Sequence, residues 1–170
     1  MALTQLVNSI TLVALIAGMV FAVIQVRQYR EAREREAALE FLRSFQSLQM
    51  TEALRLVFAL PPGLSGEETE EALGDHMDLI YSLVTTWESI AILVFRNAVD
   101  LSLVDDFFSG PLLVSWEKLE PLVHRMRART SRETISEWFQ WLAERMIERE
   151  AVVPPEPAHI VNRGWRPKKR

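Results

Sequence analysis

Residues 17–36 read AGMVFAVIQVRQYREARERE, and apolar sequence passes here into dense charge with no proline or glycine at the junction. The apolar run extends from Leu6 to Val26, and no charged side chain occurs in residues 1–26. A helix of this length is about 30 Å long, which matches the hydrocarbon core of a bilayer. The run therefore predicts a transmembrane anchor over residues 1–26.

Two other interpretations of this run are a cleaved export signal and a buried core helix. An export signal carries positive charge before its apolar part and a cleavage site of small residues after it. No basic side chain precedes Leu6, and the sequence Val26-Arg27-Gln28 is a poor cleavage context. A buried core helix is the less favoured alternative, and the anchor is preferred.

The basic side chains next to the anchor all lie on its carboxyl side. Basic residues at membrane ends stay in the cytoplasm. We therefore expect a single-pass protein with its N-terminus outside and its C-terminal domain in the cytoplasm, and the default membrane is the bacterial inner membrane. These basic residues are Arg27, Arg30, Arg33 and Arg35.

One face of the predicted anchor carries only small and polar side chains, which recur at spacings of three and four residues. Such a face lets a second helix approach closely and form hydrogen bonds across the contact. It predicts contact with another transmembrane protein or with a second copy of this chain, although small residues are also common in membrane helices that make no contact. The face consists of Thr4, Asn8, Thr11, Ala14, Gly18, Ala22 and Gln25.

Residues 27–60 are predicted to form a helical stalk that joins the anchor to the domain. Pairs of opposite charge four residues apart, such as Arg27 and Glu31, support an exposed helix. A flexible linker would normally be rich in glycine, serine or proline, unlike this charged exit. Near Gln49 the apolar register slips, so Thr51 is predicted to cap a separate short helix over residues 52–60.

Residues 61–150 are predicted to form an antiparallel helical bundle, which makes the chain all-α. Ser65 and Glu68 form a capping box that opens a helix running to about residue 97. Thr130 and Glu133 have the same spacing and are predicted to open the last helix. Apolar side chains at helical spacing give each helix one buried face.

Proline and a further cap set the remaining boundaries of the predicted bundle. Asp100 is predicted to cap a short helix that ends at residues 109–111, with the sequence Ser-Gly-Pro. The next helix contains Pro121, which is predicted to kink it near Glu117.

Glu88 stands out because it lies within the apolar sequence LVTTWESIAILVF. A buried carboxylate is costly unless it is paired and hydrogen-bonded. We therefore predict that Arg125 or Arg127 forms an ion pair with it. An enzyme that uses Glu88 or Glu120 is the weaker alternative, and it requires a polar pocket inside the bundle.

The sequence predicts no catalytic, cofactor-binding or metal-binding residue. Cysteine is absent, which excludes disulfides and thiolate metal sites. His124 lies one turn from Glu120, but a di-metal bundle needs further ligand pairs of this kind on other helices. No glycine-rich phosphate motif occurs, and a net charge of -4 does not favour nucleic-acid binding.

Residues 151–170 form a proline-containing basic tail that is predicted to be extended. Basic residues near a membrane attract anionic lipid. The tail is therefore expected to contact lipid or an acidic partner, or else to remain solvated. Its candidate contact residues are Arg163, Trp165, Arg166, Lys168, Lys169 and Arg170.

The arrangement of these features resembles a family. One span, an arginine-rich exit, the sequence WESIAILVFRNAVDLSLVDDFF, Trp116 with Pro121, and WFQWLAERM occur in this order. This order resembles uncharacterised bacterial single-span membrane proteins with a helical cytoplasmic domain of unknown function. The resemblance covers residues 6–146 and implies no activity, cofactor or site.

Taken from its residues, the chain is expected to be a non-enzymatic, membrane-anchored interaction module, an accessory or assembly subunit of a membrane protein complex. The alternative is a homo-oligomeric, membrane-tethered regulator or sensor.

Overall fold

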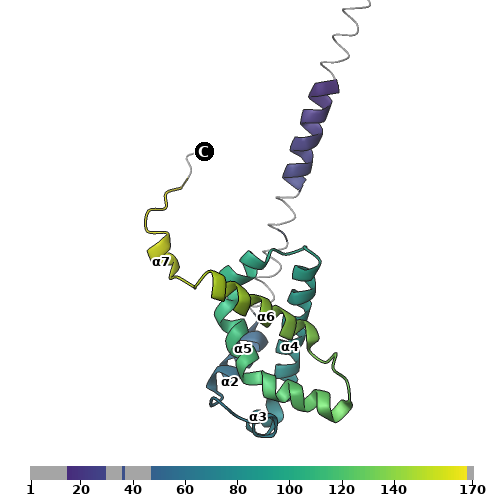
Figure 1. Cartoon of the computed structure of the whole chain (residues 1–170), viewed down its shortest axis with the longest axis vertical. Coiled ribbons are helices and arrows are strands. Elements are labelled where there is room, and N and C mark those ends of the chain that lie inside the picture. The colour runs from purple at the N-terminus through teal and green to yellow at the C-terminus, as the bar shows by residue number, and fades with distance from the viewer. Residues whose placement is uncertain (1–14, 30–35, 37–46, 168–170) are drawn as a thin grey trace, which may run out of the picture. The chain divides into compact units, whose positions relative to one another are not determined.

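The computed structural model describes residues 15–29, 36 and 47–167, and every regular element in them is helical. No strand occurs in these residues, so the prediction of an all-α chain is confirmed for them. By its internal contacts the chain divides into two compact units, Met1–Ser44 and Phe45–Arg170 (Figure 1).

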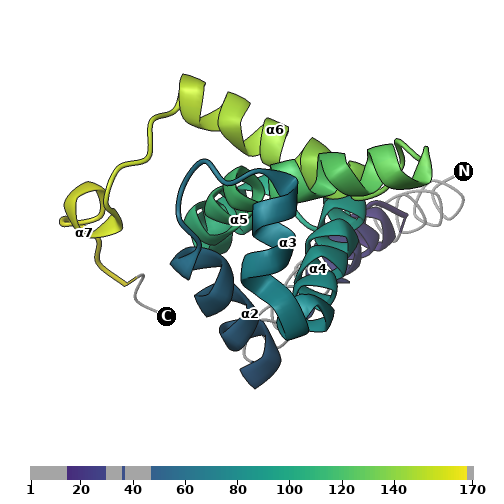
Figure 2. The ribbon, with the colours of Figure 1, turned by 90° about the horizontal axis from the view of Figure 1, so that it is seen from below.

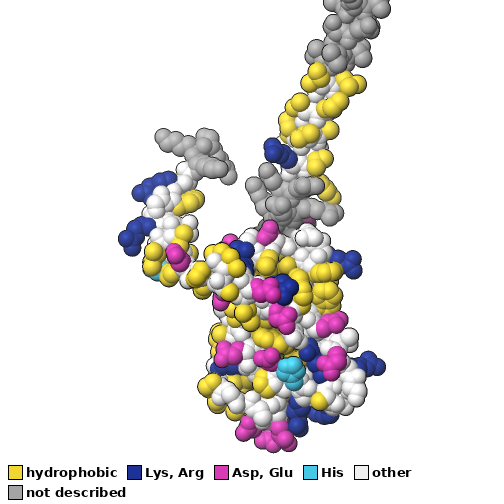
Figure 3. Space-filling view, in the orientation of Figure 1, with side chains coloured by type: hydrophobic (Ala, Val, Ile, Leu, Met, Phe, Trp, Pro, Cys, Tyr) yellow, Lys and Arg dark blue, Asp and Glu magenta, His cyan; other side chains and the backbone are white. Residues whose placement is uncertain are grey.

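The described part of the first unit is the helix Leu15–Tyr29. Every residue of this helix is exposed, and Figure 3 shows hydrophobic side chains in yellow along it. The predicted anchor begins at Leu6, so its first residues lie outside the described part of the chain. The exposed large apolar side chains are Leu15, Ile16, Met19, Val20, Phe21, Val23, Ile24 and Val26.

Among the described residues, the helix that is long and apolar enough to cross a membrane is Gly66–Phe95, whereas Leu15–Tyr29 is a shorter apolar helix. The core helix of a water-soluble domain meets the same criterion of length and composition. Gly66–Phe95 contains α4 (Met77–Phe95), which buries one face, including Leu83 and Trp87, inside the second unit. The chain is thus compatible with a membrane location, and α4 contributes to the core of the domain.

In the second unit, α2 (Leu48–Ala59) and α6 (Glu137–Val152) each pack against both α4 and α5 (Leu101–Thr130). Figure 2 shows α2 and α6 on opposite sides of α4 and α5. The helix α3 (Gly66–Leu73) packs against α5. The last part of the predicted stalk, residues 48–59, therefore belongs to the packed domain.

Aromatic side chains from three helices meet in the core of this domain. Trp87 is fully buried and stacks on Phe139, with ring centroids 6.3 Å apart. Trp116 meets Phe139 edge to face at 5.1 Å, and Phe108 meets Trp87 at 6.2 Å. The apolar faces that helical spacing predicted on α4, α5 and α6 are thus largely the buried ones.

The predicted capping box at Ser65 is confirmed. The Ser65 hydroxyl accepts a hydrogen bond from the backbone N–H of Glu68, and the Glu68 carboxylate accepts one from the backbone N–H of Ser65. The helix it opens is interrupted earlier than predicted, because the 3-10 turn η1 (Gly74–His76) separates α3 from α4. Gly74 has φ 45°, a backbone conformation that favours glycine.

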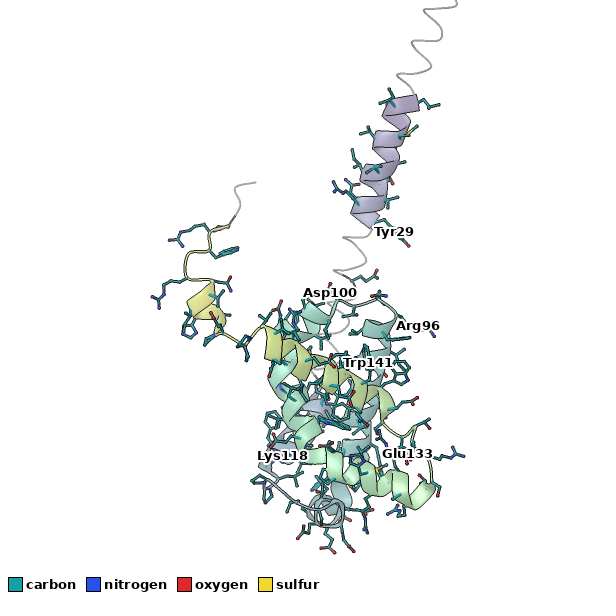
Figure 4. All side chains as sticks on the ribbon, in the orientation of Figure 1. Tyr29, Arg96, Asp100, Lys118, Glu133 and Trp141 are labelled. Atoms are coloured by element: carbon teal, nitrogen blue, oxygen red, sulfur yellow. The ribbon has the colours of Figure 1, made fainter. Side chains whose placement is uncertain are left out.

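The predicted end of a helix at residues 109–111 is wrong, since α5 continues through Pro111 and Pro121 to Thr130. Each proline removes one backbone hydrogen bond. Burial of the apolar face of α5, including Leu112 and Trp116, offsets this loss. Figure 1 shows α5 changing direction in its second half, and Lys118 lies near the bend in Figure 4, consistent with the predicted effect of Pro121.

Two predicted helix starts differ from the structure. Ser47, not Thr51, caps α2, and its hydroxyl accepts a hydrogen bond from the backbone N–H of Met50 at 3.1 Å. Thr130 is the last residue of α5, where its hydroxyl donates to the carbonyl of Met126. It therefore cannot open α6, which begins seven residues later at Glu137.

Candidate functional site

The N-terminus of α6 is capped by a side chain from another helix. Its N-cap residue, Ser136, has φ 55° and makes no side-chain cap. The first N–H groups of a helix have no partner within the helix. Oε1 of Glu88, on α4, accepts hydrogen bonds from the backbone N–H groups of Trp138 and Phe139 at 2.9 and 3.2 Å. A carboxylate also suits the positive end of a helix.

The structure therefore does not bring Glu88 to Arg125 or Arg127, the predicted partners. Arg125 lies against α3, where its Nε is 3.0 Å from Oε2 of Glu70. Main-chain N–H groups of α6 take the place of the predicted arginine at Oε1 of Glu88. The predicted ion pair is replaced by a helix cap.

Arg127 is buried, with 6% of its surface exposed. Its Nε donates to the carbonyl of Ile135 at 2.9 Å, and its Nη1 donates to Oε1 of Gln140 at 2.7 Å. Arg127 thus binds the connection between α5 and α6, while Glu88 binds the first turn of α6.

A cavity of about 270 Å³ lies beside Glu88. Its walls come from α4, from the second half of α5 and from residues 134–136. Most of the lining is apolar and includes Ile80, Val84 and Leu122. The lining also includes four residues that carry hydroxyl groups, Tyr81, Thr85, Thr134 and Ser136, and Glu88 is its one charged residue.

This cavity was not foreseen from the sequence, because residues 134–136 were expected to be helical. Glu120, the other carboxylate considered, is outside the cavity lining. It lies on the surface, where Oε1 is 3.5 Å from Nε2 of His124. Among the described residues, no group of three or more histidine, aspartate or glutamate side chains is placed to hold a metal ion.

A second surface feature is an aromatic cluster formed by Phe95, Trp138 and Trp141, here called the aromatic surface. The ring of Phe95 lies 4.9 Å from that of Trp138 and 5.9 Å from that of Trp141, centroid to centroid. Phe95 is 52% exposed. Figure 4 labels Trp141 on α6, close to Arg96 at the end of α4. This cluster is not predicted from the sequence; the spacing of Trp138 and Trp141, three residues apart on one helix, is the signal that could have indicated a shared face.

The predicted contact face of the anchor is described only in part. Gly18, Ala22 and Gln25 are exposed on the helix Leu15–Tyr29, and a Cβ atom added to Gly18 would meet nothing within 4 Å. Arg27 is also exposed. The other predicted residues of this unit, Thr4, Asn8, Thr11, Ala14, Arg30, Arg33 and Arg35, lie outside the described residues.

The basic tail is less extended than predicted, because it contains the short helix α7 (Ala158–Val161). Pro154, Pro155 and Pro157 precede this helix and Pro167 follows it, so no proline interrupts residues 158–161. Arg163, Trp165 and Arg166 are exposed, as a contact surface requires. Lys168, Lys169 and Arg170 lie outside the described residues.

Comparison with known proteins gives a family but no activity. Neither the search of curated proteins nor the search of solved structures finds a match. Residues 12–146 match a family model that is described as a domain of unknown function, DUF4760. This match covers most of the chain, and the expected resemblance to an uncharacterised family is confirmed. The chain belongs to the DUF4760 family.

Proposed function

We propose that this protein is a non-enzymatic, single-pass membrane protein whose helical domain is an interaction module, an accessory or assembly subunit of a larger membrane protein complex. The observation that supports the proposal is the helix Leu15–Tyr29, whose apolar side chains are all exposed. Uncharged sequence precedes this helix back to residue 1. Exposure of such an apolar surface to water is unfavourable in free energy, whereas exposure to the hydrocarbon of a bilayer is not.

The proposed topology follows from the charges beside the anchor. Arg27, Arg30, Arg33 and Arg35 stay in the cytoplasm, so the N-terminus faces outward and the second unit is cytoplasmic. The packed helices of residues 48–152 then form a cytoplasmic antiparallel bundle, which a helical stalk joins to the anchor. The membrane that holds the anchor is a bacterial inner membrane. A carbonate wash of membranes tests the anchoring: the protein stays in the pellet, and its release into the supernatant would contradict the proposal.

The anchor binds the partner through its face of small and polar side chains, on which Gly18 is central. The test is purification of the full chain in mild detergent, followed by cross-linking and mass determination. We expect a different membrane protein to be recovered with it. Gly18→Ile adds bulk on this face and abolishes the association, whereas Val20→Phe adds bulk on another face and preserves it. Equal recovery with both variants would exclude this contact face.

The aromatic surface extends the contact into the cytoplasmic part of the same partner. Aromatic side chains are enriched in the buried centre of protein interfaces. Phe95→Ser is expected to weaken recovery of the partner. Phe107→Ser removes a similarly exposed ring of α5 and leaves recovery unchanged. Equal loss in both variants would show that the effect is not specific to the aromatic surface.

The second candidate function is a homo-oligomeric regulator or sensor, and the cavity beside Glu88 favours it because a sensor needs a place for its ligand. The same purification distinguishes the two functions. A complex whose mass is a whole multiple of 19.6 kDa, with no other protein in it, would support the regulator.

A further inference from the structure

We propose that the cavity beside Glu88 binds a small organic cation, namely a primary amine carried on a short apolar body. This inference concerns the domain alone. It depends neither on anchoring in a membrane nor on the identity of a protein partner.

The size of the cavity sets the size of the ligand. A volume of about 270 Å³ lies between the roughly 150 Å³ that holds benzene and the roughly 300–1,000 Å³ of sites for drug-sized molecules. Apolar side chains such as Val84 and Leu122 make up most of the wall. The body of the ligand is therefore apolar and about as large as one substituted aromatic ring.

The charge of the cavity sets the charge of the ligand. Glu88 is the one charged residue in the lining. The buried cation next to the lining, Arg127, donates to the carbonyl of Ile135 and to Gln140 rather than to Glu88. The N-terminus of α6 supplies only about half a positive charge. The lining itself therefore carries a negative charge, which favours a cation and disfavours an anion.

Glu88 also has hydrogen-bonding capacity left for a ligand. Its Oε1 accepts from Trp138 and Phe139, while Oε2 accepts no hydrogen bond from the described residues. An ionised carboxylate offers about four acceptor sites on its two oxygens. In the proposed complex a primary ammonium group donates to Oε2, and two hydroxyl-bearing residues of the lining, Thr85 and Thr134, supply further acceptors.

Benzylamine, benzyl alcohol and benzoate are suitable probes, because they share one ring and differ in charge. Each is titrated by calorimetry into the full chain in detergent, with the heat of mixing into empty micelles subtracted. We expect saturable binding of benzylamine, at least about tenfold weaker binding of benzyl alcohol because its hydroxyl carries no positive charge to pair with the carboxylate, and none of benzoate. Absence of saturable benzylamine binding, or equal binding of benzoate, would overturn the proposal.

Variants show whether any binding is in this cavity. Glu88→Gln keeps an oxygen that accepts from Trp138 but removes the charge, so benzylamine binds at least about tenfold more weakly. Glu120→Gln makes the same change outside the cavity and leaves binding unchanged. Val84→Trp fills the cavity and abolishes the binding of both benzylamine and benzyl alcohol. If circular dichroism shows that Glu88→Gln is unfolded, the test rests on the Val84→Trp variant. Unchanged affinity of Val84→Trp for benzylamine would overturn the proposal.

Discussion

Oε1 of Glu88 lies 2.9 Å from the backbone nitrogen of Trp138, 50 residues further along the chain, so a side chain of α4 caps α6. A helix usually takes its cap from the residue just before it. In α6 that residue, Ser136, has a left-handed backbone and makes no cap. The carboxylate of Glu88, on α4, caps α6 instead.

Loss of this cap is expected to destabilise the domain. Glu88→Ala leaves two N–H groups of α6 without a protein partner and costs about 1–3 kcal/mol in free energy of unfolding. Glu88→Gln retains an acceptor and costs less. The measurement is denaturant unfolding of the full chain in detergent, followed by tryptophan fluorescence. Glu120→Ala, on the surface of α5, is the control and changes stability by less than about 0.5 kcal/mol. Equal effects of the two alanine variants would contradict the cap.

Two glycines respond in opposite ways to alanine. A Cβ atom on Gly66 would lie 2.8 Å from Cβ of Arg125 and closer still to the carbonyl oxygen of Pro121. Gly66→Ala therefore forces α3 away from α5 and costs about 1–3 kcal/mol. A Cβ atom on Gly110 meets nothing within 4 Å, so Gly110→Ala stabilises α5 by about 0.5–1 kcal/mol. Thermal unfolding of both variants tests the pair, and a Gly66→Ala protein as stable as the wild type would refute the close contact.

Lys118 caps the C-terminal end of α2. Its ammonium group donates hydrogen bonds to the carbonyl of Phe58 at 3.0 Å and to the carbonyl of Leu60, at the end of α2. Lys118→Met keeps the apolar stem but removes these donors, and it is expected to cost about 1–3 kcal/mol. Arg132→Met, which removes an exposed charge after α5, is the matched control. Hydrogen exchange at the end of α2 measures the effect locally, and unchanged protection there would contradict it.

Acid stability depends in part on Asp100. The hydroxyl and the backbone N–H of Ser102 both donate to its carboxylate, which lowers its pKa below the ordinary value of 3.8. A carboxyl group with a lowered pKa stabilises the fold fully above its unfolded pKa, and this contribution is lost as the pH falls through the folded pKa. Asp100→Asn does not titrate, so its stability falls less steeply below pH 3.8. Unfolding curves from pH 5 to about pH 2 measure the difference, and parallel profiles would rule out this contribution.

The sequence predicts those helix ends that depend on neighbouring residues. Ser65 and Glu68 satisfy one another's backbone across three residues, so their spacing is sufficient to identify the cap. Thr130 and Glu133 have the same spacing but lie at the end of α5, because α6 receives its cap from Glu88. Spacing alone does not distinguish a local cap from one that arrives from another helix.

The sequence also fails to predict the partner of Glu88 and the length of α5, because both depend on packing between helices. An isolated carboxylate in apolar sequence suggests an arginine partner, but helix ends also supply donors, and their positions depend on packing. Pro111 would end an isolated helix. In the domain, the buried side chains of Leu112 and Trp116 hold the helix together across it. The cavity likewise depends on the irregular segment 134–136, which a pattern of helices does not reveal.

The caps at Glu88 and Lys118 make the folding of the domain strongly cooperative. The end of α2 is capped by Lys118 of α5, and the start of α6 is capped by Glu88 of α4. Each helix therefore depends for part of its stability on packing against a helix distant in sequence, so the helices form and unfold together. Fragments that omit α4 or α5 should therefore remain largely unfolded, and the intact domain should melt in a single transition.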